Sequence, residues 1–163
     1  METFEFLVRV VAPRETTLFD LSHAMGGTAM LEGDGAATIY FECKHSEVIK
    51  AGYALTNDVE AHGGAVTHFI TDVCDVHGLS SRLGLDFEAY LLLAMENPTG
   101  FIGFPLPSEW DDKGRPLWDW HDILRHFDER IETPRVPSRR ENDYLNWWIK
   151  YCRGRLTEWS STL

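Results

Sequence analysis

The order in which hydrophobic periodicity changes over residues 1–77 constrains the fold of this chain more than any other feature of its sequence. Residues 4–11, FEFLVRVV, place apolar side chains at every second position, and this period of two predicts a half-buried strand. A Leu-rich segment with helical spacing follows and ends at Gly26-Gly27, a pair typical of helix ends. The chain is therefore predicted to begin with a strand and a helix.

The following segments predict a hairpin, a second helix and a further strand. Residues 28–32 and 37–43 flank Gly33-Asp34-Gly35, and Asp-Gly favours tight hairpin turns because both residues accept positive φ. A helix with an apolar stripe is then expected from Ser46, and a strand over residues 66–74. The resulting order, strand-helix-strand-strand-helix-strand, is the ferredoxin-like βαββαβ arrangement of the α+β class.

Beyond residue 77 the pattern becomes mainly helical. Helices are predicted over residues 86–96 and 118–132, and a final helix from Asn142 to about Trp159. We therefore expect two parts: a ferredoxin-like α+β core with an antiparallel sheet (1–77), and a C-terminal helical extension packed on that core (78–163). Because this fold hosts many unrelated functions, it does not select one.

The length, cysteine content and hydrophobic runs of the chain indicate the cellular compartment in which it folds. A chain of 163 residues with 44% hydrophobic residues is long enough to bury a core without disulfide bonds. Its three cysteines are odd in number and form no CxxC pair, which favours reduced thiols. No signal-like start and no apolar run of about 20 residues is present, so we expect a cytoplasmic protein without a membrane partner.

The charge of the chain is strongly negative and unevenly distributed. The formal net charge is −11; residues 1–112 carry net −13 and residues 135–163 carry net +3. Binding to phosphates needs clustered Lys and Arg, so we expect no direct nucleic-acid partner. An acidic body suits a basic partner instead, and one alternative function is an acidic nucleic-acid mimic that binds a basic protein.

Residue types that bind metals gather near the strand predicted over residues 66–74. They are His68, Asp72, Cys74, Asp75 and His77, with Cys43 and His45 as more distant members. In the predicted sheet, strands 37–43 and 66–74 lie on either side of strand 4–11, so their ends are about 10 Å apart, too far for one ion. We therefore expect no metal and no cofactor.

Catalytic signatures are equally weak. Asp122, His126 and Glu129 share one face of the helix predicted over residues 118–132, and we interpret them as solvated ion pairs because the opposite face is apolar. No nucleophile elbow or phosphate-binding glycine loop is present.

The sequence leaves open whether the chain is an enzyme and favours no particular reaction. The rival hypothesis is a small-ligand sensor or enzyme with a site between the sheet and the C-terminal helices, formed by His68, Tyr40 and Asp72.

The final helix carries two neighbouring apolar stripes, more than one buried face requires. The first stripe is Leu145, Trp148, Ile149, Cys152, Leu156 and Trp159. The second is formed by Tyr144, Trp147 and Tyr151. Trp, Tyr and Arg are favoured interface anchors, so the predicted partner-binding residues are Tyr144, Trp147, Tyr151 and Arg155.

The leading hypothesis is a non-catalytic protein-binding or regulatory module, with a homodimer formed through this helix as its simplest form. The competing interpretation packs the second stripe within the chain, against Phe101, Phe104 and the open sheet face.

Overall fold

The structure, a computed structural model, describes residues 1–33, 35–96, 104–127 and 134–153 of the chain. The protein is a mixed α+β protein with an antiparallel sheet and several helices. It divides into two compact units. Unit 1 comprises residues 1–71 and 134–163, and unit 2 comprises residues 72–133. In sequence, unit 2 is therefore an insertion within unit 1.

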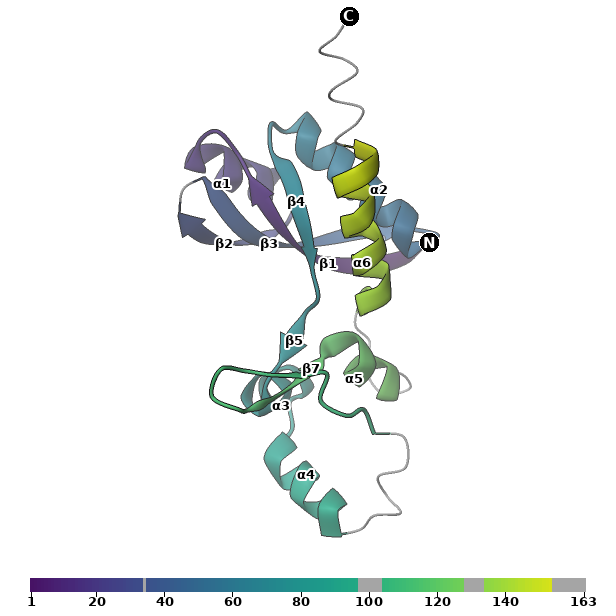
Figure 1. The fold of residues 1–163 in the computed structure, drawn as a ribbon. Helices are drawn as coiled ribbons and strands as arrows, with labels where there is room; N and C mark the ends of the chain where they lie inside the picture. The colour runs from purple at the N-terminus through teal and green to yellow at the C-terminus, as the bar shows by residue number, and fades with distance from the viewer. Residues whose placement is uncertain (34, 97–103, 128–133, 154–163) are drawn as a thin grey trace, which may run out of the picture. The chain divides into compact units, whose positions relative to one another are not determined.

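Unit 1 is built on a four-stranded sheet (Figure 1). Its elements are β1 (Glu2–Val11), α1 (Glu15–Ala24), β2 (Thr28–Gly33), β3 (Ala36–His45), α2 (Val48–Ala61), β4 (Ala65–Ile70), α6 (Arg139–Trp148) and a π-helical turn (Ile149–Arg153). The strands lie in the order β2-β3-β1-β4, and β1 pairs antiparallel with both β3 and β4. The antiparallel pair β2–β3 confirms the predicted hairpin, although Asp34 in its turn lies outside the described residues.

One face of this sheet forms the core of unit 1. Alternation along β1 buries every second side chain almost completely, which confirms the strand predicted over residues 4–11; these side chains are Phe4, Phe6, Val8 and Val10. The helices α1 and α2 cover the same face with Leu18, Leu21, Leu55 and Val59. Burial of one such side chain contributes about 1.5–3 kcal/mol relative to exposure, so the packing on this face stabilises unit 1.

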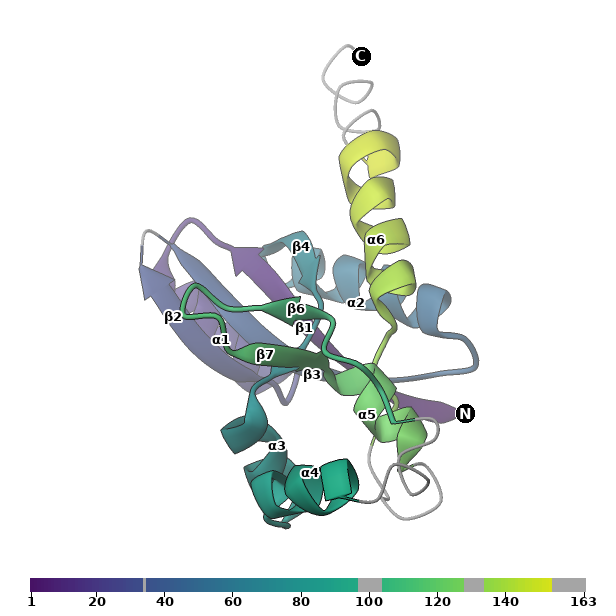
Figure 2. The ribbon, with the colours of Figure 1, turned by 60° about the horizontal axis from the view of Figure 1, so that its bottom comes forward.

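The opposite face of the sheet carries polar side chains next to β2. Arg9 Nε donates a hydrogen bond to Glu32 Oε2 over 2.8 Å, and the Thr38 hydroxyl donates to Glu32 Oε1. The Thr38 hydrogen bond and, after it, the Arg9 hydrogen bond hold the pKa of the Glu32 carboxyl below its ordinary value. Figure 2 shows β2 as the outer strand on the side of the sheet away from β4 and α6.

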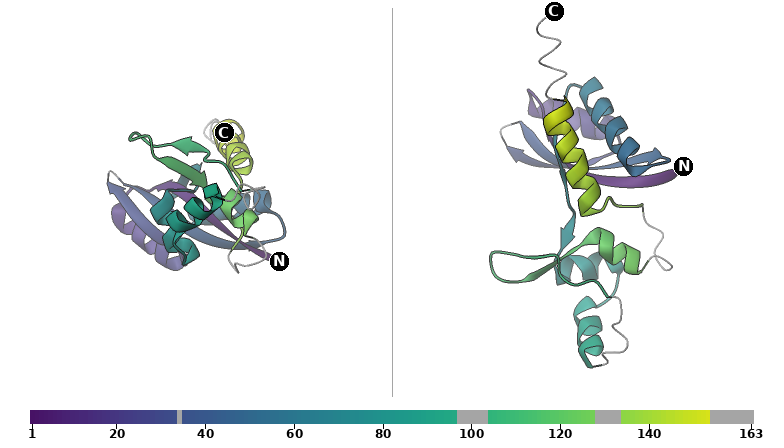
Figure 3. Two further views of the ribbon diagram at one scale, coloured as in Figure 1. Left: turned by 90° about the horizontal axis from the view of Figure 1, so that it is seen from below. Right: turned by 45° about the vertical axis from the view of Figure 1, so that its right-hand side comes forward.

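Unit 2 (teal to green in Figure 3) has its own sheet, and aromatic side chains pack together within it. Its elements are β5 (Val73–Cys74), α3 (Val76–Leu83), α4 (Phe87–Glu96), β6 (Glu109–Trp110), β7 (Pro116–Asp119) and α5 (Trp120–His126). The strands lie in the order β5-β7-β6. Buried Phe87 packs between the rings of Tyr90, Phe104 and Trp118. Its core is therefore formed largely by aromatic rings.

These units differ from the expected division into residues 1–77 and 78–163. The helix predicted from Trp118 begins at Trp120, because Pro116–Asp119 pairs with β5 and β6 as a strand. The final helix belongs to unit 1, where Leu145 joins the core on the side of α1 and α2 instead of covering the open sheet face. The periodicity of the sequence showed which side of each helix is apolar. It did not show which part of the protein that side packs against.

Among the helices in the described part of the chain, none has the length and apolar character needed to cross a bilayer.

Candidate functional site

The final helix, α6, is held at its N-terminal end by a capping box. Glu141 N–H donates to Ser138 Oγ over 3.3 Å, and Ser138 N–H donates to the Glu141 carboxylate over 2.8 Å. Immediately before it, Arg135 pairs with β1: its N–H donates to the Thr3 carbonyl and its carbonyl accepts from Glu5 N–H, both over 2.9 Å. The start of α6 is thus tied to the sheet.

The inner side of α6 packs on β4 and α2, and Figure 3 shows α6 (yellow) alongside α2. The Asn146 side-chain oxygen accepts from Phe69 N–H over 2.7 Å, and its amide nitrogen donates to the Phe69 carbonyl over 2.8 Å. Leu145 is fully buried against Gly52, where a Cβ atom would lie 2.7 Å from the Leu145 side chain. The role of Asn146 was not predicted; the available signal was an amide beside the apolar stripe of the helix.

The outer side of α6 carries three aromatic residues in a row, Tyr144, Trp147 and Tyr151, which we call the aromatic ladder. Their ring centroids are 6.0 Å apart between Tyr144 and Trp147 and 6.1 Å apart between Trp147 and Tyr151. They are 46%, 50% and 47% exposed, respectively. The described part of the helix therefore separates into the two predicted stripes, one inward and one outward. Arg155, the fourth predicted partner-binding residue, lies outside the described residues.

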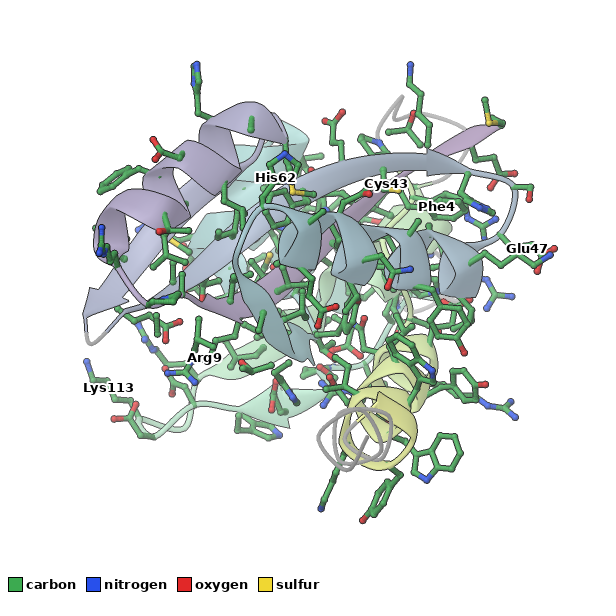
Figure 4. All side chains as sticks on the ribbon, turned by 90° about the horizontal axis from the view of Figure 1, so that it is seen from above. Phe4, Arg9, Cys43, Glu47, His62 and Lys113 are labelled. Carbon is green, nitrogen blue, oxygen red and sulfur yellow. The ribbon has the colours of Figure 1, made fainter. Side chains whose placement is uncertain are left out.

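Contacts with α2 fix the orientation of the aromatic ladder. Tyr53 of α2 packs on Trp148 with ring centroids 4.4 Å apart. The Tyr53 hydroxyl also donates a hydrogen bond to the Tyr144 hydroxyl over 3.2 Å. Figure 4 shows α6 beside α2, whose two ends are marked by Glu47 and His62. The ladder is therefore presented by two helices that are packed together.

The last turn of the helix is π-helical and contains Tyr151. Such turns are uncommon and occur often at functional sites, because the extra residue redirects side chains. Lys150 Nζ lies 5.1 Å from the centroid of the Tyr151 ring, within cation–π range. Arg140, one turn before Tyr144, is also exposed. Exposed cations thus lie at both ends of the ladder.

The charge around the ladder contrasts with that of unit 2. Residues 134–163 contain six basic and three acidic side chains, net +3. Unit 2 contains thirteen acidic and five basic side chains, net −8. The ladder is thus part of a locally basic segment in an acidic protein, which favours acidic partners.

The residues of the rival ligand site fall in different parts of the molecule. Tyr40 and His68 lie on β3 and β4, on either side of β1, so they are separated by two strand spacings, about 10 Å. Asp72 belongs to unit 2, where the Arg82 guanidinium donates to both carboxylate oxygens over 2.6 and 3.2 Å. Asp72 is thus occupied by an ion pair.

The partner of Asp72 was not predicted from the sequence. The Arg82 guanidinium lies 5.0 Å from the centroid of the Trp120 ring as well as on Asp72. The backbone adds a third link, because Trp120 N–H donates to the Asp72 carbonyl over 2.8 Å. Asp72 precedes β5 and Arg82 belongs to α3, so no pattern within a single helix or strand indicated the pair.

The other metal-ligand candidates are in surroundings that suit a structural role. Burial raises the pKa of the Cys74 thiol to about 11, and it raises the pKa of the Cys43 thiol as well. Thiolates rather than thiols bind metal ions. Where the structure describes side chains, it groups no three His, Cys, Asp or Glu residues in a way that would hold a metal ion. On α5, Asp122 and His126 are exposed, and Glu129 lies outside the described residues.

No protein-family model, curated protein or solved structure matches this chain.

Proposed function

We propose that this chain is a non-catalytic protein-binding module whose aromatic ladder docks on the acidic surface of a second copy of the chain. The observation that carries the proposal is the row formed by Tyr144, Trp147 and Tyr151, each about half exposed on an anchored helix. Trp and Tyr dominate the binding energy of protein interfaces when they become buried there. The ladder supplies three such side chains in one line.

The anchoring of the ladder favours binding. Association costs free energy when flexible side chains must be ordered, roughly 0.5–1.5 kcal/mol for each rotamer-rich side chain. Tyr144 is already held by the Tyr53 hydroxyl, and Trp148 beside it is packed on the Tyr53 ring. Part of the ordering cost is therefore met in the unbound protein.

The charge distribution supports an acidic partner surface. Arg140 and Lys150 lie near the two ends of the ladder, while unit 2 carries net −8. The basic segment of one copy is thus attracted to the acidic unit of another. Because exposed charges are screened over about 10 Å at 0.1 M salt and about 3 Å at 1 M salt, this association weakens as salt is added.

We also propose the ferredoxin-like arrangement as the classification of β1–β4 with α1 and α2. The order β2-β3-β1-β4 and the packing of both helices on one face support it. This arrangement leaves the β4 edge accessible to α6, and α6 in turn presents the ladder. The fold itself does not determine the function.

The experiment is a comparison of molar mass by light scattering over a concentration series at low salt. The wild type is expected to associate, and Trp147→Ala/Tyr151→Ala is expected to weaken association by about 2 kcal/mol or more for each residue. Phe19→Ala, which removes a similarly exposed ring from α1, is the matched control and should leave association unchanged. A concentration series that is the same for the wild type and the double variant would contradict the proposal.

A further inference from the structure

The two outer edges of the sheet in unit 1 differ in whether their backbone groups are hydrogen-bonded to another segment. At the β4 edge, Asn146 pairs with both backbone groups of Phe69, and Asn142 Nδ2 donates to the Ile70 carbonyl over 3.3 Å. At the other edge, β2 pairs with β3 on its inner side only. Within the described residues, its one hydrogen bond to another segment joins the Glu32 side chain to Arg9. One edge is therefore covered and the other is open.

The open edge contains neither Lys nor Pro, and the two features that oppose pairing, the Glu32 carboxylate and a register shift, lie at its C-terminal end. Natural edge strands are commonly interrupted by Lys or Pro, and β2 has the sequence TAMLEG. Met30 and Leu31 are 53% and 41% exposed and point to opposite faces of the sheet. The one irregularity is the register shift between Leu31 and Gly33. Residues 28–31, before this shift, form a regular strand without a charged side chain.

We propose that β2 pairs antiparallel with β2 of a second copy, with the two-fold axis at Met30. In this register Met30 faces Met30, Ala29 faces Leu31, and Thr28 faces Glu32. Apolar side chains thus meet apolar side chains, and the two Glu32 carboxylates, each bonded to Arg9 of its own sheet, do not face one another. The segment is self-complementary, which is the requirement of a two-fold contact.

This pairing produces a closed dimer with one continuous eight-stranded sheet. Growth by strand pairing stops at two copies because the outward edges of the dimer are the β4 edges covered by Asn142 and Asn146. The inference goes beyond the proposed function and does not rest on it. Since α6 packs beside β4, the dimer carries its two aromatic ladders at opposite ends of the sheet, beyond β4 strands that lie about 34 Å apart at a spacing of about 4.8 Å. Two ladders on one particle increase avidity for a repeated partner surface.

The test uses opposite charges at the two-fold axis. Full-length Trp147→Ala/Tyr151→Ala serves as the parent, measured at high salt, so that the ladder contributes nothing to association. The parent is expected to be a dimer by light scattering. Met30→Lys and Met30→Glu should each be monomeric, because like charges then lie directly opposite one another. An equimolar mixture of the two variants should recover the dimer, as a heterodimer.

Controls separate pairing from folding. Met30 is an exposed side chain, so both variants should retain the circular dichroism spectrum and melting temperature of the parent. Leu106→Lys, which adds a lysine at an exposed apolar position of unit 2, should leave the dimer intact. A monomeric parent overturns the inference even if the wild type associates through its ladder. A dimer that persists in both Met30 variants, or a mixture that stays monomeric, also overturns it.

Discussion

The side-chain amide of Asn146 forms two hydrogen bonds with the backbone of Phe69, accepting from its N–H over 2.7 Å and donating to its carbonyl over 2.8 Å. This is the pattern that a neighbouring strand would offer, supplied here by one side chain of α6. An edge strand with unpaired backbone groups invites pairing with other chains. Asn146 therefore both docks α6 and closes this edge of the sheet.

Replacing Asn146 by Ala should loosen α6 from β4. The variant loses two hydrogen bonds and leaves the Phe69 amide without its protein partner, so we expect a loss of about 1–3 kcal/mol. Amide exchange at Phe69, measured by NMR, should accelerate accordingly. Asp143→Ala removes an exposed side chain from the same helix and should stay within about 0.5 kcal/mol of the wild type. Equal effects of the two substitutions would contradict the assigned role.

Gly52→Ala tests the packing of α6 on α2. A Cβ atom at this position would lie 2.7 and 2.8 Å from the two δ-carbons of Leu145. Overpacking of this kind costs about 1–3 kcal/mol, partly offset by the gain of up to about 1 kcal/mol from replacing Gly in a helix. Chemical denaturation should show that adding Leu145→Ala to Gly52→Ala costs less than Leu145→Ala costs in the wild type. Strict additivity of the two substitutions would show that they do not touch.

The β2–β3 turn provides a matched pair of glycines. Gly33 and Gly35 both have positive φ, 84° and 71°. A Cβ at Gly35 would also lie 2.6 Å from the Ala12 carbonyl oxygen, whereas at Gly33 it would meet open space. Gly35→Val should therefore destabilise the protein by about 1–3 kcal/mol, and by more than Gly33→Val does. A larger loss for Gly33→Val would show that the turn does not approach Ala12.

The Cys74 thiol should be unreactive in the folded protein. Its burial raises the pKa from 9.0 to about 11, so the thiol stays protonated at neutral pH. Alkylation followed by peptide mass analysis should find Cys74 modified only after unfolding. Because the folded state binds the proton more tightly than the unfolded state, unit 2 should lose stability as pH rises from about 9 to about 11. Cys74→Ala should remove this alkaline slope, and a slope that persists in Cys74→Ala would contradict the assignment.

Local patterns were sufficient for the regular elements of unit 1. The alternation of Phe4, Phe6 and Val8 predicted which face of β1 is buried, because side chains on a strand alternate between its two faces. On the last helix, the repeat of 3.6 residues placed Leu145 and Trp147 on different faces in the same local way. In both cases the required information lies within a few neighbouring residues.

Contacts between distant segments were not predictable in this way. Asn146 with Phe69, Leu145 with Gly52 and Asp72 with Arg82 join positions that do not share one helix or strand. The existence of unit 2 was not predicted for the same reason. Its strand β7 (Pro116–Asp119) is held by pairing with β5 and β6, and β5 lies about 40 residues earlier in the chain. Single-sequence patterns report local preference, and tertiary pairing overrides it.

The most direct test of the central claim, that the aromatic ladder is a protein-binding surface, is hydroxyl-radical footprinting of the wild type at increasing protein concentration. Trp147 and Tyr151, each about half exposed, should become less oxidised as the chain associates. Met1, 98% exposed, provides the internal reference and should be oxidised equally at every concentration. Protection of Trp147 and Tyr151 that grows with concentration is the predicted result. Oxidation of both residues that stays constant while the molar mass rises would contradict the account.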